Sequence, residues 1–249
     1  MKTYQRYILL LVLFTTVIEV QEALAGPGGK ILKELFSSPL GKIVGVVLGI
    51  ILLPFIIYVR VKEAMGTKRT YRDLKTLAVS HPETFEWFNV KNRITEVFGR
   101  VHSAWRKEDM SNAAEWMTSW YWQNQQLMYL DRWQEQGLVN VCNVRAVKSI
   151  DPLHLNCSNR KDFEGTRLVA SITANMEDYL AERESGNVVE GKKGYKDGET
   201  VWTFLLENGK WKAENIEEGS VSLSYAKLQN VMPTFSTAKD VGVYGESRV

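Results

Sequence analysis

The sequence IVGVVLGIILLPFIIYV, from Ile43 to Val59, determines how the rest of the chain is organised. Its seventeen residues carry no charge, and Lys42 and Arg60 flank it. A helix needs about 17 to 25 apolar residues to cross the hydrocarbon core of a bilayer. We therefore predict a transmembrane helix over residues 40–60. The alternative, a core helix of a soluble domain, is disfavoured because no other part of the chain could surround it.

The first 25 residues have the three parts of a secretory signal peptide. Lys2 and Arg6 form a basic start, Tyr7–Ile18 is an apolar run, and Ala23-Leu24-Ala25 is a small-residue cleavage pattern. We therefore predict a signal peptide over residues 1–25. The alternative is an uncleaved first membrane helix, which would form a hairpin with the apolar stretch described above.

The distribution of charge predicts which way the chain crosses the membrane. Lys and Arg are in excess on the cytoplasmic side of membrane helices. Six cations follow the apolar stretch, with two acids among them: Arg60, Lys62, Lys68, Arg69, Arg72 and Lys75. The short glycine-containing segment at residues 26–39 is then exposed on the outer side. This predicts a single-pass protein of the cytoplasmic (inner) membrane, with its large C-terminal part facing the cytoplasm.

The same six cations suit the anionic headgroups of a membrane surface, where each is worth about 1 kcal/mol. We expect residues 61–82 to form a basic juxtamembrane helix or linker that binds anionic lipids. The alternative is that these charges only set the topology.

Small residues recur at every fourth position along one face of the membrane helix. They are Gly41, Gly45 and Gly49. Such a face lets another helix approach closely, which indicates oligomerisation or docking to a membrane partner. Glycine is also common in membrane helices without that role.

Charge and cysteine content limit the function of the C-terminal part. Net charge is +2, but residues 1–76 carry eleven Lys/Arg against five Asp/Glu, whereas residues 77–249 carry twenty against twenty-four. A nucleic-acid-binding domain needs a positive surface, so no nucleic-acid partner is expected. Cys142 and Cys157 form no CxxC pair, and the three histidines are not spaced as zinc ligands. We expect free thiols in the cytoplasm, and no metal or cofactor.

Apolar residues recur with helical spacing from residue 83 to Gly137. One helix face is formed by Val90, Ile94, Val97, Phe98, Val101 and Trp105. Asp109 or Ser111 is expected to cap a short helix. A longer helix is expected over residues 119–136, ended by Gly137. Its predicted core residues are Trp120, Leu127, Leu130 and Trp133.

Beyond Gly137 the period of the apolar residues changes to two, as in β-strands. The predicted strands are one from Val139 with an irregularity near Cys142, then Leu168–Met176, Val201–Leu206 and Lys210–Ile216, the last two joined by an Asn208-Gly209 turn. Residues 182–196 are expected to be a loop, and residues 219–249 a C-terminal tail. Three helices followed by a curved antiparallel sheet predict an α+β fold.

Several of these segments resemble, in order and spacing, the Tim44-like domain family. They are Phe98–Met110, Trp116–Tyr121, Leu130–Asn140, Asp178-Tyr179, Val201–Phe204, and Trp211 with Ile216. Together they span residues 83–218, more than half of the chain. One departure is Leu205, which stands where the family often has Arg.

The resemblance implies an NTF2-like α+β cone over residues 83–218. The family includes the mitochondrial import subunit that anchors a chaperone at the translocase, and bacterial membrane-anchored relatives, to which the signal-like start and single helix are similar. It implies a non-enzymatic protein that holds a protein partner at the inner membrane surface, in protein transport or membrane-complex assembly. Chaperone binding is not carried over, because the long charged N-terminal half of the import subunit has no counterpart here.

A cone of this kind has a concave side that could hold a ligand. The aromatic residues expected to face it are Trp105, Trp116, Trp120, Tyr121, Tyr129, Trp133, Trp202, Phe204 and Trp211. Aromatic residues at such spacing more often form a core, but an open aromatic cavity could hold an acyl chain or a peptide. No residue is assigned a catalytic role. Asp178 with Tyr179 is a weak candidate pair, and Lys192–Lys196 is expected to be a solvated basic loop.

Two other functions stay open at this point. One is a membrane-tethered protein that binds a lipid or small molecule, including an isomerase-like enzyme. The other is a VirB8-like secretion assembly factor, which would place the domain outside the cytoplasm.

Overall fold

The computed structural model describes residues 39–234, which form an α+β fold. The chain divides into two compact units, residues 1–61 and 62–249. The signal peptide predicted over residues 1–25, the exposed segment up to residue 38, and the end of the tail beyond residue 234 lie outside the described residues.

The first half of the described chain is helical and the second half is mostly strands. The helical elements are α3 (Pro39–Ala78), α4 (Pro82–Phe85), α5 (Trp87–Arg106), a 3₁₀ turn (Met110–Ala113), α6 (Ser119–Gln125), a π-helical turn (Gln126–Leu130) and α7 (Asp131–Glu135). The strands are β1 (Leu138–Asn156), β2 (Arg167–Glu182), β3 (Val188–Gly191), β4 (Lys196–Glu207) and β5 (Lys210–Glu218). A 3₁₀ turn (Gly219–Val221) and α8 (Ser222–Lys227) follow.

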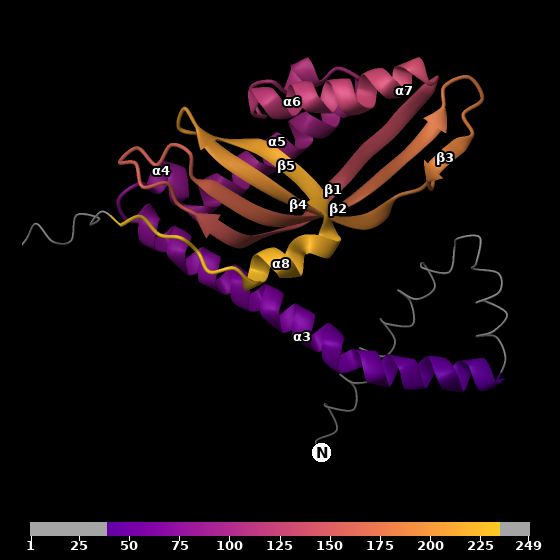
Figure 1. Cartoon of the computed structure of the whole chain (residues 1–249), viewed down its shortest axis with the longest axis horizontal. Helices are drawn as coiled ribbons and strands as arrows, with labels where there is room; N and C mark the ends of the chain where they lie inside the picture. The colour runs from indigo at the N-terminus through magenta and orange to yellow at the C-terminus, as the bar shows by residue number, and fades with distance from the viewer. Residues whose placement is uncertain (1–38, 235–249) are drawn as a thin grey trace, which may run out of the picture. The chain divides into compact units, whose positions relative to one another are not determined.

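The strands form one antiparallel sheet in the order β1-β2-β4-β5, with β3 beside β2. β1 pairs with β2 along its length, and the register shifts at three places, the first between Val144 and Ala146. Such bulges bend and twist a strand, and the sheet is strongly curved (Figure 1). The irregularity predicted near Cys142 therefore lies slightly later, because Cys142 itself pairs regularly with Asp178. The loop expected over residues 182–196 contains β3.

Helix α5 packs its apolar face into the main core, on the side of the sheet where α6 and α7 also lie (Figure 1). The buried residues of α5 are Val90, Ile94, Val97, Phe98, Val101 and Ala104. The expected stripe is confirmed except at its end, where Ala104 is buried and Trp105 is partly exposed. Asp109 caps the following 3₁₀ turn, its side chain accepting a bond from Ser111 N at 3.0 Å.

The second half of α3 and α8 lie on the other side of the sheet (Figure 1). Leu74 and Leu77 of α3 are fully buried in the main core. Gly66 lies so close to α8 that an added Cβ would be 2.9 Å from backbone atoms of Ala226. Residues 62–78 are therefore part of the folded domain. The helix expected there is confirmed, but Leu74 and Leu77 pack into the domain, whereas Met65 and Tyr71 are exposed.

A segment that we call the C-terminal strap, residues 228–234, fastens α3 to the sheet. The Asn230 side chain accepts bonds from Thr70 Oγ1 at 3.2 Å and Leu155 N at 2.9 Å, and donates to Asp73 Oδ2 at 2.8 Å. Val231 N donates to Leu155 O at 2.9 Å. The first part of the expected tail is therefore folded, held by polar groups whose partners lie about 75 to 160 residues away.

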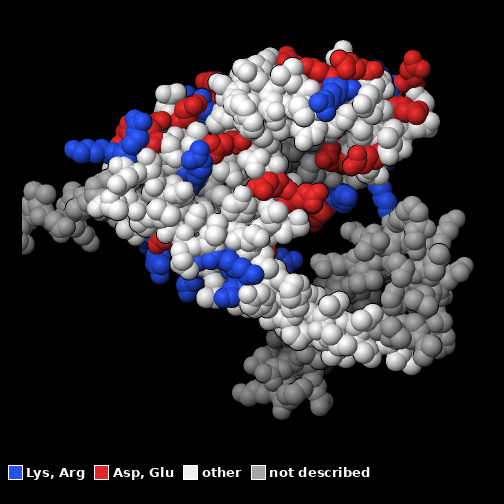
Figure 2. Space-filling model, viewed as in Figure 1, with Lys and Arg blue, Asp and Glu red and all other residues white. Residues whose placement is uncertain are grey.

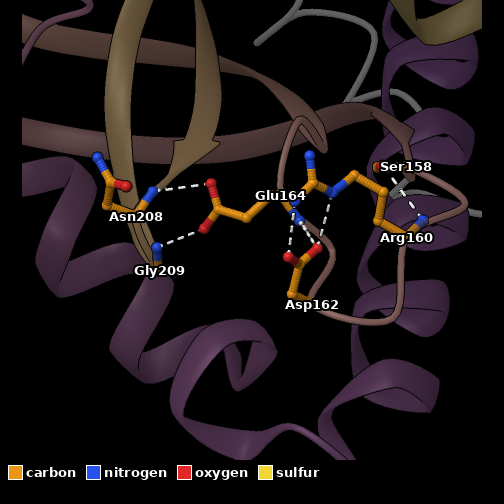
Figure 3. A network of polar contacts seen from close by, with 6 residues as sticks. All are labelled: Ser158, Arg160, Asp162, Glu164, Asn208 and Gly209. Carbon is orange, nitrogen blue, oxygen red and sulfur yellow. Dashed lines mark hydrogen bonds and ion pairs between the residues drawn. The ribbon is translucent and has the colours of Figure 1, made fainter.

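The predicted Asn208-Gly209 turn is confirmed, with positive φ of 53° and 68°. Its two amide groups donate to the carboxylate of Glu164, at 2.8 Å from Asn208 N and 2.6 Å from Gly209 N (Figure 3). Glu164 belongs to the loop between β1 and β2, where Arg160 and Asp162 also form an ion pair at 2.9 Å. These contacts hold the β1–β2 loop against the β4–β5 turn and so stabilise the fold at this end of the sheet.

Candidate functional site

The first stretch of α3 has the composition of a membrane anchor. Among the residues that the structure describes, α3 is the one helix long and apolar enough to cross a membrane. Its side chains have little contact with the protein, and Ile51 is 64% exposed. At Gly49 an added Cβ would meet nothing within 4 Å, so this part of the predicted glycine face is open. The surroundings of Gly41 and Gly45 are not described to that detail.

The six cations predicted to bind the membrane surface divide into three groups. Lys68, Arg72 and Lys75 are exposed on the second half of α3, and Figure 2 shows blue side chains over this region. Arg60 and Lys62 lie about two turns earlier in the same helix. Arg69 points into the domain, where its Nη2 donates to Ala226 O at 3.0 Å. Its assignment as a lipid-binding residue is wrong, because a guanidinium that ties α3 to α8 is not available to a headgroup.

Four of the nine aromatic residues proposed to line a pocket are core residues. They are Tyr121, Trp202, Phe204 and Trp211. Trp202 Nε1 donates to Thr200 Oγ1 at 2.9 Å, and Trp211 Nε1 donates to Thr84 O at 3.0 Å. Trp202 also packs against Phe98, with ring centroids 5.2 Å apart. These side chains fill the space between helices and sheet, so they do not line an open cavity.

Four more of the nine lie in the helical layer and are partly or largely exposed. Trp105, Tyr129 and Trp133 form a triangle with ring centroids 5.6 to 6.0 Å apart. Trp116 lies beneath the guanidinium of Arg100, whose Cζ is 4.7 Å from the ring centroid. Together they fasten α5 to the helices that follow it.

Trp120, the ninth, is 69% exposed, so its prediction as a core or pocket residue is wrong. The buried positions are Tyr121, Gln125 and Leu130, and Leu127 is 63% exposed. The expected single helix is divided by the π-helical turn, which shifts the facing of the residues around it. Gln126 fixes this turn, because its Oε1 accepts from Met110 N at 2.8 Å and its Nε2 donates to Asp131 Oδ1 at 2.6 Å.

An apolar surface results from this arrangement. We call it the outer helical face and define it as Trp120, Leu127, Met128 and Tyr129, all exposed. No Asp, Glu, Lys or Arg occurs from Thr118 to Leu130. Figure 2 shows an uncharged surface over α6, with charged side chains around it. Charged residues are depleted, and Trp, Tyr and Met enriched, at the centres of protein interfaces. Only the aromatic content of this segment was apparent from the sequence; its exposure was not.

The titratable groups of the core are held in their neutral forms. His102 packs against Trp202, with ring centroids 5.8 Å apart, and its Nδ1 lies 2.8 Å from Phe98 O. Burial lowers the pKa of His102 to about 4. Burial likewise raises the pKa of the free thiols Cys142 and Cys157 to about 12. These thiols stay protonated and unreactive at neutral pH.

Asp178 and Tyr179 are consecutive residues of β2. Neighbouring side chains of a strand point to opposite faces, so the two do not form a catalytic pair. In the basic loop, Gly194 N donates to Glu177 Oε1 at 2.7 Å, and the Cζ of Arg145 lies 4.0 Å from the ring centroid of Tyr195. The loop is therefore fastened to the sheet, with its side chains exposed.

The sequence matches no protein-family model and no curated protein. Among solved structures, the chain is similar to the intermembrane space region of chloroplast protein ARC6, with 10% identity and a TM-score of 0.36. The match covers 49% of this chain and 91% of that one. A similarity this low assigns neither a fold family nor a function.

Proposed function

We propose that this protein is a non-enzymatic, single-pass membrane protein that holds a protein partner at the cytoplasmic face of the inner membrane, in protein transport or membrane-complex assembly. The main support is α3. One helix supplies both an exposed apolar stretch and residues of the domain core, Leu74 and Leu77. A protein built in this way keeps its folded domain attached to the anchor without a separate linker.

Three features of the domain favour a binding role over catalysis. Its interior is filled by its own aromatic side chains, among them Trp202 and Phe204. Its half-buried histidine, His102, has a pKa far below neutrality and lies beside aromatic rings, with no described carboxylate as hydrogen-bond partner. An acid–base catalyst needs a group whose pKa lies near the pH at which the enzyme works, and an oriented partner for that group. The exposed apolar surface instead lies on the outside, at the outer helical face.

We also propose that the domain is an NTF2-like cone related to the Tim44-like family. A long α5 packed on a bent antiparallel sheet supports this. The domain would extend over residues 62–234, beyond the 83–218 indicated by the resemblance, because α3 and the C-terminal strap contribute buried residues and bonds.

Two alternatives make different demands. A membrane-tethered binder of a lipid or small molecule needs an interior cavity, and the filled core counts against it. A VirB8-like secretion assembly factor needs the domain on the outer side of the membrane. The choice between that factor and our proposal therefore depends on topology.

Membrane attachment is tested by fractionating cells that express the full chain. We expect the protein to remain in the membrane pellet after carbonate extraction at high pH. A matched variant with Leu52→Lys and Phe55→Lys in the apolar stretch should move to the soluble fraction. Release of the unaltered protein by carbonate would contradict the anchor.

Topology is tested with a cysteine at an exposed site of α7, Gln134→Cys, and a membrane-impermeant maleimide. The native thiols are suitable background because both are buried. We expect labelling only after the cells are opened. Labelling of intact cells would place the domain outside and favour the VirB8-like alternative. In-cell crosslinking with mass spectrometry then tests for a partner, and its consistent absence would count against the holding role.

A further inference from the structure

One exposed side of the second half of α3 carries cations and apolar residues but no acid. We call it the basic stripe, formed by Met65, Lys68, Arg72 and Lys75, with Val79 directly after the helix ends. The spacings of three and four residues place these side chains on one side of a helix. Met65 is 57% exposed and Val79 is 81% exposed, so the apolar members of the stripe are open to contact.

The acids of the same stretch bond to the domain instead. Glu63 and Asp73 are the two acids between residues 62 and 79. Glu63 Oε1 accepts a bond from Ser222 Oγ of α8 at 2.5 Å. Asp73 Oδ2 accepts one from Asn230 Nδ2 at 2.8 Å. Arg72 Nε also lies 3.4 Å from Asp73 Oδ1, but its side chain is 74% exposed, against 17% for Asp73. The fold therefore sorts charges that alternate along the sequence, with both acids inward and three cations outward.

We propose that the basic stripe binds the headgroups of anionic lipids, so that this side of the domain lies against the membrane in which the chain is anchored. The inference rests on the membrane anchor of the proposed function and adds a second contact with the bilayer. Lys and Arg attract anionic headgroups, and apolar side chains among them enter the interface. The basic stripe has both kinds of side chain on one side of a helix, as this contact requires.

The chain itself keeps lipid close to the basic stripe. Lys68 follows Val59, the last residue of the apolar sequence, by nine residues, and Lys75 follows it by sixteen. At 1.5 Å per residue these separations are about 14 and 24 Å of helix. Tethering at such short range gives the headgroups a high effective concentration at the stripe. An acidic protein, the other occupant that the cations would suit, has no tether of this kind.

The remainder of the domain carries the opposite net charge. Residues 77–249 have twenty Lys/Arg against twenty-four Asp/Glu. Anionic lipid therefore attracts the basic stripe and, on average, repels the rest of the domain. Helices α6 and α7 lie on the other side of the sheet from the second half of α3 (Figure 1) and would face away from the bilayer. The lipid contact thus determines which side of the domain is presented to a protein partner.

The proposal is tested by measuring how closely the basic stripe approaches headgroups in nanodiscs that hold the full chain. An NBD fluorophore is attached to Thr76→Cys, an exposed position beside the stripe, or to Gln134→Cys on α7 as the control. The native thiols are buried and give little background. The discs contain a lipid with a nitroxide on its headgroup, which quenches nearby NBD. The other lipid is phosphatidylcholine, alone or with about 30% phosphatidylglycerol to supply the negative charge.

In the anionic discs we expect quenching at position 76 to be about fivefold stronger than at position 134. In the neutral discs quenching at position 76 should fall about threefold, because headgroup charge no longer holds the stripe. Raising the salt concentration should weaken quenching in the anionic discs for the same reason.

Two triple variants with the same change in net charge separate the stripe from charge in general. The first removes its cations: Lys68→Gln, Arg72→Gln and Lys75→Gln. The matched control removes two Lys and one Arg from exposed positions elsewhere in the domain: Lys107→Gln, Arg132→Gln and Lys192→Gln. The first should reduce quenching at position 76 about threefold in anionic discs, and the control should not. Equal urea unfolding of the two variants excludes loss of folding as the cause.

Other outcomes would overturn the inference. Equal quenching in neutral and anionic discs, or in the two triple variants, would show that the cations only set the topology. Equal quenching at positions 76 and 134 would show that the stripe does not face the membrane and would assign it to an acidic protein. Failure of the chain to co-elute with the discs would remove the anchor as well. Loss of the lipid effect in discs that do hold the chain removes the basic stripe alone.

Discussion

The two stretches of α3 belong to one helix, but the apolar side chains of the first are exposed and those of the second are partly buried in the domain. In the first, residues 43–61, apolar side chains such as Ile51 and Phe55 are exposed, and the helix is long and apolar enough to cross a membrane. In the second, residues 62–78, Leu74 and Leu77 are buried and polar groups such as Arg69 and Thr70 are bonded to the domain. Secondary structure therefore does not separate the apolar stretch from the domain, whereas the burial of side chains does.

The largest expected effect is the loss of folding when the second stretch is removed. A fragment of residues 83–218, the bounds of the family resemblance, lacks Leu74, Leu77 and the C-terminal strap. We expect it to be unfolded or aggregated, whereas residues 62–234 should fold. Circular dichroism and cooperative urea unfolding measure this. A folded 83–218 fragment would show that the second stretch of α3 is only an accessory.

Leu74→Ala should cost about 3 kcal/mol of unfolding free energy, because it leaves a cavity in a closed core. Leu52→Ala in the first stretch should leave the unfolding of the domain unchanged. Urea titration of the full chain in detergent, followed by tryptophan fluorescence, measures both. Similar losses in the two variants would remove the distinction between the stretches.

The stability of the domain should fall on acidification because His102 is held neutral. Its pKa is about 4 when folded and about 6.5 when unfolded, so the unfolded chain binds more protons in that window. Lowering the pH from 7 to 4.5 should remove about 2 kcal/mol through this group. His102→Gln should flatten this part of the pH dependence, although it costs some packing at all pH values. An unchanged slope would mean that other groups dominate.

Gly66→Ala should be destabilising by about 1 kcal/mol, since the overlap with Ala226 outweighs the helix propensity gained. Gly99→Ala is the matched control, because an added Cβ there meets nothing within 4 Å and the propensity gain should remain. Thermal melting of both variants in detergent compares them. A stabilised Gly66→Ala variant would indicate that α8 moves away from α3 at little cost.

The elements that follow local rules could be predicted from the sequence. The long apolar helix, the α5 stripe from Val90 to Val101, the alternation in β2 and the Asn208-Gly209 turn all depend on composition, period and turn chemistry within short segments. The facing of the α6–α7 segment could not be predicted in this way. Trp120 and Tyr121 are both aromatic, and distant bonds position the segment, such as Thr118 N to Ala213 O at its start and Met110 N to the Gln126 side chain.

The domain boundary also depended on distant contacts. Residues 61–82 carry enough Lys and Arg to look like a surface segment, yet Leu74 and Leu77 have core partners far along the chain. The bonds of Asn230 link the strap to α3 through side chains that sequence periodicity does not reveal. The candidate site was therefore predicted in composition, but its arrangement in space was not.

The position of the sheet within the domain also determines the distance between α3 and α6. The second half of α3 lies on one side of the sheet and α6 on the other (Figure 1). Packed layers are about 10 Å apart, so α6 would lie about 20 Å from the axis of that helix, and a partner bound to the outer side of α6 would lie farther away still. The domain would act as a spacer of fixed thickness, and the second half of α3 would stay free of the partner and available to a different neighbour.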